Sequence, residues 1–184
     1  MKNLKKEFSF GICLYRINNK TKKLEILLGT HELTPNRWGL LKGKREINET
    51  NEQTAKREFF EEAGLDVDIN SYEKYFIQKN FYKDVGVWTY NANKVKNLNS
   101  YFDDDILKYK TDENDEIKWF QLDKLPKIHN SQFKMITSIK KHLVKKRRLN
   151  RKKRIKKEKL INPNINNRGR NSITTNHTND FSNR

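Results

Sequence analysis

The feature that most constrains the fold is a short helical segment whose two ends are both marked. Between residues 50 and 64 the apolar residues recur at every fourth position, as Ala55, Phe59 and Ala63. That spacing places them on one face of an α-helix. Thr50 or Asn51 can act as the N-cap, and Gly64 follows the last periodic residue as a C-cap. The segment is therefore predicted to be a helix that packs one face against a core.

Segments with the composition of β-strands flank this helix. Two precede it, at residues 8–17 and 24–29, and four follow it, at residues 65–69, 72–81, 85–90 and 116–121. A polar, acidic loop at about 91–115 separates the last two strands. A second helix is expected from about Ser131, and it can continue into the basic run after residue 144. This alternation of strands and helices predicts an α/β fold.

Three carboxylates share one face of the first helix. At about 100° per residue, Glu61 and Glu62 lie within about 60° and 40° of Glu58. Like charges at these spacings destabilise a helix by a few tenths of a kcal/mol per pair. Arg57 can shield one of them, and a hard divalent cation that prefers oxygen ligands would neutralise the face better. A merely solvated acidic face has the same composition, so the glutamates alone leave both interpretations open.

The longer segment from residue 43 to residue 65 resembles the Nudix box, G-x5-E-x7-R-E-U-x-E-E-x-G-U, where U is a bulky apolar residue. It matches without an insertion at Gly43, Glu49, Arg57, Glu58, Phe59, Glu61, Glu62, Gly64 and Leu65. So many specified positions at fixed spacing rarely coincide by chance. The sequence is therefore similar to the Nudix hydrolases, and the similarity covers about residues 8–143.

The resemblance implies an α/β/α sandwich with a mixed sheet that hydrolyses a nucleoside diphosphate linked to another moiety. The ligands that it implies for Mg²⁺ or Mn²⁺ are Glu58, Glu61, Glu62 and the carbonyl of Gly43. Glu58, Glu61 and Arg57 would belong to the catalytic set, with Arg57 and Glu49 orienting the loop and the glutamates. Such metal ions neutralise a pyrophosphate and lower the pKa of a bound water, so no covalent nucleophile is needed.

The general base is expected outside this helix, because carboxylates that bind metal are weak proton acceptors. In several Nudix families the base is a glutamate on a loop near a late strand. Here the candidates are Glu113, just before the predicted strand at 116–121, and Glu116, the first residue of that strand. Either of them could equally be an ordinary loop acid.

The residues around the motif bear on the substrate. The stretch Trp38-Gly-Leu-Leu-Lys-Gly-Lys44 resembles the W-x-F-P-K-G-K segment of the catalytic subunit of mRNA-decapping enzymes, and residues 116–126 resemble its E-W-F-x-I-x-x-L-P segment. Both segments also resemble, less closely, those of diadenosine tetraphosphate hydrolases and diphosphoinositol polyphosphate hydrolases. These enzymes usually carry His where this chain has Lys44. Leu41 replaces a proline common to all of them. The resemblance implies that Trp38, Lys42 and Lys44 bind substrate.

The positive charge is concentrated in one short segment. The chain has a formal net charge of +17, and residues 141–160 hold 12 of its 40 Lys and Arg residues against one acidic residue. A domain with nearly equal numbers of acidic and basic residues, followed by such a segment, is typical of a protein that binds a polyanion. Nucleic acid is the favoured partner, before an anionic membrane surface. The predicted RNA-binding residues are Lys145, Lys146, Arg147, Arg148, Arg151, Lys152, Lys153 and Arg154. A solubilising or nuclear-import segment is the alternative.

Three functions remain open at this level. The first is removal of the RNA cap, with an exposed ring from Trp38, Trp88, Tyr82 or Trp119 stacking on 7-methylguanine. The second is hydrolysis of a small nucleotide or diphosphoinositol phosphate such as diadenosine tetraphosphate, and the third is RNA binding by an inactive Nudix fold. Each of the four aromatic residues is more commonly a core residue than a stacking platform.

The expected organisation is a Nudix domain at 1–143, a basic helical extension at 144–160 and a disordered Asn-rich tail at 161–184. The chain has one cysteine, Cys13, and therefore no internal disulfide, so an intracellular, cytoplasmic setting is expected. No stretch approaches the roughly 20 apolar residues of a transmembrane helix, so no membrane partner is expected.

Overall fold

The computed structural model describes residues 6–31, 33–109 and 114–161. They fall into two compact units, one ending at Val144 and the other starting at Lys145. The first unit contains the sheet and the motif helix, and the second contains the basic part of the last helix. Within the described residues, no helix is both long and apolar enough to cross a bilayer.

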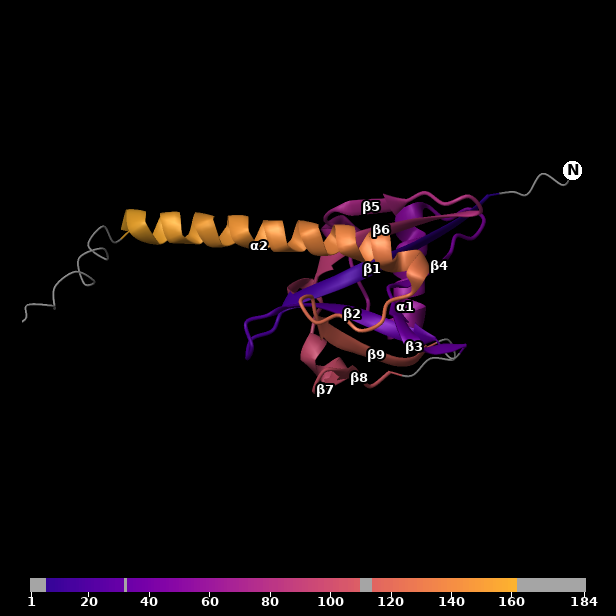
Figure 1. Cartoon of the computed structure of the whole chain (residues 1–184), viewed down its shortest axis with the longest axis horizontal. Coiled ribbons are helices and arrows are strands. Elements are labelled where there is room, and N and C mark those ends of the chain that lie inside the picture. Colours follow the sequence, from indigo (N-terminus) through magenta and orange to yellow (C-terminus); the bar gives the residue numbers. More distant parts are fainter. Residues whose placement is uncertain (1–5, 32, 110–113, 162–184) are drawn as a thin grey trace, which may run out of the picture. The chain divides into compact units, whose positions relative to one another are not determined.

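A single mixed sheet forms the centre of the first unit (Figure 1). Its described strands are β1 (Glu7–Ile17), β2 (Leu24–His31), β3 (Thr34–Gly39), β4 (Leu41–Lys44), β5 (Tyr75–Gln78), β6 (Lys83–Asn91), β7 (Phe102–Asp103), β8 (Ile106–Leu107) and β9 (Asn114–Gln121). The order is β5-β6-β1-β2-β9-β8-β7, with β3 paired to β2 and β4 paired to β1. Strands β1 and β6 run parallel, and the other described pairs are antiparallel.

Two helices cover the two faces of this sheet. The described helices are α1 (Asn51–Ala63), α2 (Phe133–Ile161) and the 3-10 turns η1 (Ile69–Ser71), η2 (Ala92–Lys94), η3 (Leu98–Tyr101) and η4 (Asn130–Gln132). Helix α1 buries Ala55, Phe59 and Ala63 in a cluster on one face. The first turns of α2, through Ile139 and Leu143, pack in a second cluster on the other face. This arrangement confirms the predicted α/β/α sandwich with a mixed sheet.

Both ends of α1 are fixed as the sequence indicates. Thr50 is the N-cap and forms a capping box with Gln53, because the Thr50 hydroxyl accepts from the Gln53 N–H and the Gln53 side chain accepts from the Thr50 N–H. Gly64 ends the helix with φ of 65°, and its N–H donates to the Phe60 carbonyl at 2.7 Å. This left-handed conformation suits glycine, which has no Cβ to clash.

The predicted strand at 65–69 is wrong. Leu65 and Val67 are buried in the cluster under α1, but the segment pairs with no strand in the described part of the chain, and the turn η1 begins at Ile69. Alternating apolar residues indicate that one side of a segment is buried. An extended segment can bury one side without forming hydrogen bonds to a neighbouring strand. The strand predicted at 72–81 is shorter in the structure, where β5 covers only Tyr75–Gln78.

Short strands are the other difference from prediction. Strand β3 precedes the motif and β4 contains its first residue, Gly43, whereas β7 and β8 form a hairpin inside the region predicted as a loop at 91–115. These segments are two to six residues long, too short to show a period. Helix α2 does continue into the basic run, to Ile161. The tail predicted as disordered lies, from residue 162 on, outside the described residues.

Candidate active site

Arg57 organises the acidic face of α1. Its guanidinium donates to Glu49 at 2.6 and 3.1 Å, and to Glu58 and Glu61 at 2.8 Å each. It also donates to the Lys44 carbonyl at 3.0 Å, which ties the helix to the end of β4. One side chain thus fixes the loop before α1 and two of the three motif glutamates. Arg57 thus contacts both the loop and the glutamates that the resemblance expects it to orient.

Glu49 is held as a carboxylate by this arrangement. Hydrogen bonds from Arg57, above all, lower its pKa from 4.5 to about 2, with contributions from the backbone of Glu46 and the hydroxyl of Thr54. A carboxylate with so low a pKa is a poor proton acceptor near neutral pH. Glu49 is therefore a positioning residue and not a candidate base. Glu49 first, and then Glu58 and Glu61, raise the pKa of Arg57, so the guanidinium stays charged.

The missing side chain at Gly43 lets Glu58 approach the backbone. A Cβ built at residue 43 would overlap the Glu58 carboxylate, so only glycine leaves room for it. Glu58 and Glu62 are each only 8% exposed, whereas Glu61 lies at the surface. Two carboxylates with so little exposure concentrate negative charge that a protein interior tolerates only when it is compensated.

These residues fit a hard divalent cation. Carboxylate and carbonyl oxygens are the ligands that Mg²⁺ and Mn²⁺ prefer, and Gly43 and Glu58 already lie together. In the described residues, however, no three His, Cys, Asp or Glu side chains converge as a ready-made metal cluster. The ion pairs of Arg57 with Glu58 and Glu61 explain this, because they draw those carboxylates toward the guanidinium. A bound ion has to compete with Arg57 for them.

Lys42 adds positive charge near the glutamates. Lys42 is half-buried, and burial is the main cause that lowers its pKa, followed by the charge of Lys83, while Glu62 and Glu58 oppose the shift. The register explains this neighbourhood, since β4 and β6 lie on opposite sides of β1 and Lys42 is opposite Gly11. A Cβ at Gly11 would overlap Lys42, so this glycine admits the lysine. Lys42 is therefore close enough to feel the charge of Lys83 as well as the charges of Glu58 and Glu62.

Lys83 was not among the residues predicted from the sequence. It begins β6, some 20 positions after the motif, and comes to the site because β6 pairs parallel with β1 and puts Lys83 opposite Glu7. Glu7 in turn accepts from Lys44 at 2.5 Å, and Lys44 first and Lys83 second lower the pKa of Glu7. A parallel, non-local pairing leaves no local sequence signal, so only the fold identifies Lys83.

The two candidate bases are placed differently. Glu113 lies outside the described residues. Glu116 is on β9, where it accepts from Lys118 at 3.1 Å, and Lys118 lies over the Trp38 ring at 4.8 Å. Ile117 belongs to the cluster under α1, so the strand pleat directs Glu116 and Lys118 to the opposite face. None of the contacts described for Glu116 brings it to the motif glutamates, and its role stays a prediction.

Three of the four candidate stacking rings are in the core. Trp88 and Trp119 pack in the cluster under α1, and Trp38 packs on the other face, edge-on to Phe120 at 4.5 Å. Each tryptophan is less than 10% exposed, whereas Tyr82 is 66% exposed. Of the four rings, Tyr82 is therefore the one available to a ligand without rearrangement. The Lys118 ammonium lies over the Trp38 ring, and the ring itself is buried, so Trp38 offers no exposed face for stacking.

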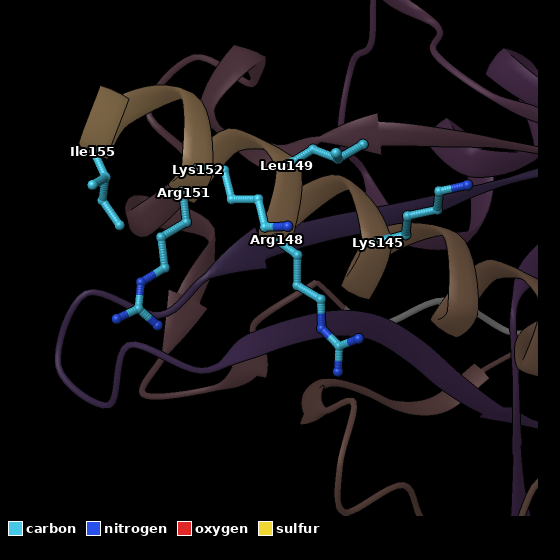
Figure 2. A pocket seen from close by; sticks show the side chains of 6 residues that line it. All are labelled: Lys145, Arg148, Leu149, Arg151, Lys152 and Ile155. Atoms are coloured by element: carbon cyan, nitrogen blue, oxygen red, sulfur yellow. The ribbon is translucent and has the colours of Figure 1, made fainter. Parts of the chain in front are cut away.

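The basic part of α2 is solvent-exposed. Lys145, Arg148, Leu149, Arg151, Lys152 and Ile155 line a hollow on its surface, and Figure 2 shows Arg148, Arg151 and Lys152 extending from the same side of the helix. Arg154 pairs with Glu158 at 3.3 Å, the acidic residue of the segment. Leu149 and Ile155 are partly exposed beside these cations. The helix therefore presents a row of cations with little internal neutralisation.

Comparison with known proteins gives a family and a fold. The sequence model of the NUDIX domain matches residues 7–139. Structural neighbours include a MutT/nudix family protein from Enterococcus faecalis and a MutT NUDIX hydrolase from Burkholderia pseudomallei, at 19% and 18% identity, each with a TM-score of 0.51. The first match covers 66% of this chain and 46% of that one, so the chain spans less than half of the Enterococcus protein; the second covers 72% and 97%.

An Ap4A hydrolase from C. elegans also matches, at 24% identity and a TM-score of 0.44, over 64% of this chain and 81% of that one. At these identities the structural likeness establishes the fold alone. No curated protein matches the sequence.

Proposed function

The chain belongs to the Nudix family of pyrophosphohydrolases, and on that premise we propose that it is a Mg²⁺- or Mn²⁺-dependent enzyme that removes the cap from RNA. The products would be 7-methylguanosine diphosphate and RNA with a 5′-monophosphate. The observation that carries the RNA part of the proposal is the exposed row of cations on α2 after Lys145. A dinucleotide is too small to need such a row, whereas the phosphates of a capped RNA continue past the scissile bond.

Glu58, Glu61, Glu62 and the Gly43 carbonyl would hold the metal ions, which supply charge neutralisation and a bound water of lowered pKa. Arg57 keeps the carboxylates in place, and Lys42 meets the negative charge of the bound pyrophosphate. The Lys44 ammonium donates to Glu7, and the Lys44 carbonyl accepts from Arg57. Lys44 would therefore contribute to substrate binding only indirectly. Glu113 or Glu116 would accept the proton of the attacking water.

The basic helix would bind the RNA backbone through its charge. Each phosphate neutralised by Lys or Arg releases counterions, so the binding constant falls steeply with salt. Because such contacts read no bases, turnover should depend on RNA length and hardly on sequence. A solubilising or targeting segment would give neither dependence.

The experiment uses the full chain with Mn²⁺ and two substrates, cap-labelled RNA and diadenosine tetraphosphate, at two salt concentrations. Release of 7-methylguanosine diphosphate that falls as salt rises is the expected result. Cleavage of the dinucleotide alone would establish the small-molecule alternative. RNA binding without turnover of either substrate would favour the inactive fold. Glu62→Gln should abolish turnover in the first two cases, and a variant as active as wild type would refute the metal assignment.

A charge-matched pair of variants isolates the role of the helix. Arg148→Gln, Arg151→Gln and Lys152→Gln together remove three cations, and glutamine preserves helix propensity. The control neutralises three exposed lysines of the first unit, Lys20, Lys96 and Lys124. The helix variant should raise the KM for capped RNA and leave dinucleotide turnover unchanged. Equal effects of the two triple variants would remove the helix from the proposal.

A further inference from the structure

Two apolar side chains lie among the cations of the basic part of α2. Leu149 is 49% exposed and Ile155 is 39% exposed. RNA phosphates contact the neighbouring Lys and Arg residues through charge, and such contacts need no aliphatic group. Aliphatic side chains also lack the ring face on which a base stacks. RNA binding therefore leaves these two residues unexplained.

The hollow around these residues has the geometry of a helix-packing surface (Figure 2). Its lining residues form two overlapping sets spaced i, i+3, i+4 and i+7, which are Lys145, Arg148, Leu149 and Lys152, and Arg148, Arg151, Lys152 and Ile155. Four residues at this spacing surround the hole that accepts one side chain from a second helix. Each set combines one apolar residue with the alkyl stems of Lys and Arg. The surface can thus take two successive apolar side chains of a partner helix.

The charge around the hollow favours an acidic partner. Four of its six lining residues are cations, and within the described part of the chain none of the four takes part in an ion pair. The pair between Arg154 and Glu158 involves no lining residue. A second copy of α2 would bring like charges together, which opposes association. Acidic residues beside the apolar residues of a partner would instead neutralise these cations.

An anionic membrane fits this surface less well than a helix does. A helix that lies on a bilayer buries a continuous apolar face at the level of the headgroups. At about 100° per residue, Leu149 and Ile155 lie about 120° apart around the axis of α2, with Arg148 and Lys152 between them. Burying both apolar residues in a bilayer would therefore also bury two charges, which is costly. Separate holes on a helix accept side chains one at a time and leave the cations at the rim.

We propose that the basic part of α2 docks an acidic amphipathic helix, whose apolar side chains insert beside Leu149 and Ile155 and whose carboxylates pair with the surrounding cations. RNA uses the same cations, so the two ligands compete. The bound helix lowers turnover of capped RNA and leaves hydrolysis of a dinucleotide unchanged. The docking surface stands without the proposed function, whereas the competition with RNA rests on it.

The test uses the full chain and a labelled model peptide. The peptide is an acidic helix with Leu at every third or fourth position and Glu on both sides, and a scrambled peptide of the same composition is its control. Fluorescence anisotropy measures binding of each peptide and of a single-stranded RNA. Sedimentation measures binding to phosphatidylcholine vesicles that contain phosphatidylserine.

Two variants separate the apolar residues from the cations. The apolar variant combines Leu149→Gln with Ile155→Gln and keeps every charge. The cation variant combines Arg148→Gln, Arg151→Gln and Lys152→Gln. Glutamine is a good helix former, so circular dichroism spectra of both variants should match wild type.

The amphipathic peptide should bind wild type about tenfold to hundredfold more tightly than the scrambled peptide, as expected for partial burial of two aliphatic side chains. The apolar variant should lose this preference and keep wild-type affinity for RNA, because the RNA contacts depend on charge. The cation variant should weaken both ligands. Excess amphipathic peptide should displace RNA and lower turnover of capped RNA, with dinucleotide turnover unchanged.

Equal affinities for the amphipathic and scrambled peptides would overturn the docking surface, since charge alone would then account for binding. Wild-type peptide affinity in the apolar variant would overturn it as well. Vesicle binding that is lost in the apolar variant, without any peptide preference, would assign Leu149 and Ile155 to a membrane surface instead. Peptide binding that depends on these two residues, in a protein that hydrolyses no capped RNA, would retain the docking surface and refute the decapping function.

Discussion

Replacing Arg57 by methionine tests how far one side chain organises the acidic face. Methionine keeps much of the alkyl packing and removes every donor. Glu49 and Glu58, with side chains 18% and 10% exposed, would lose their common partner, whereas Glu61, at 55%, is solvated without it. Breaking a buried ion pair costs about 3–5 kcal/mol, and the partial exposure here reduces the expected loss to about 2–3 kcal/mol.

The loss should depend on pH with a definite sign. Arg57 is the main cause that lowers the pKa of Glu49 from 4.5 to about 2. A lowered pKa in the folded state contributes stability that is fully present above the unfolded pKa and is lost as pH falls toward the folded value. Arg57→Met lacks this contribution. The difference in unfolding free energy between wild type and Arg57→Met should therefore shrink between pH 5 and pH 2.

Urea unfolding followed by circular dichroism measures this difference at pH 7, 5 and 3. With a slope of about 2 kcal/mol per molar urea, the midpoint at pH 7 should fall by about 1–1.5 M. The matched control is Lys56→Met on the same helix, whose pair with Asp66 at 2.9 Å is exposed and should contribute less than about 1 kcal/mol. A loss for Arg57→Met no larger than the control, or one that is constant from pH 7 to pH 3, would refute the reasoning.

Three further substitutions test the packing and the caps of the same helix. Phe59→Ala should destabilise the fold by about 3–5 kcal/mol, because its ring is fully buried, whereas the neighbouring, half-exposed Phe60→Ala should cost less than about 1 kcal/mol; equal losses in thermal unfolding would contradict the packing. Gly43→Ala should displace Glu58 and abolish Mn²⁺-dependent turnover at nearly unchanged stability, and an active variant would show that the close approach is dispensable. Thr50→Ala removes the capping box and should cost about 1 kcal/mol in urea unfolding, so an unchanged midpoint would argue against it.

The motif helix shows what a local pattern can predict. Its period, its N-cap and its C-terminal glycine depend on neighbours within four residues, and the structure reproduces all of them at Thr50 and Gly64. The carboxylate face follows from the same geometry. The strand predicted at 65–69 shows what a local pattern cannot predict. Alternating apolar residues indicate burial, whereas a strand also requires a partner strand to pair with. Residues 34–44 were harder still, since the strands β3 and β4 are too short to show a period.

Three features can be read from the residues in order, because each follows from spacing or charge along the chain. They are the family, the helix that carries the glutamates, and the separation of a charge-balanced domain from a basic segment. That Lys83 is opposite Glu7 and acts electrostatically on Lys42 is visible in the folded structure alone. That placement comes from the parallel pairing of β1 with β6, which joins residues about 75 positions apart. Register over such a separation is set by the packing of the whole sheet, and no local pattern encodes it.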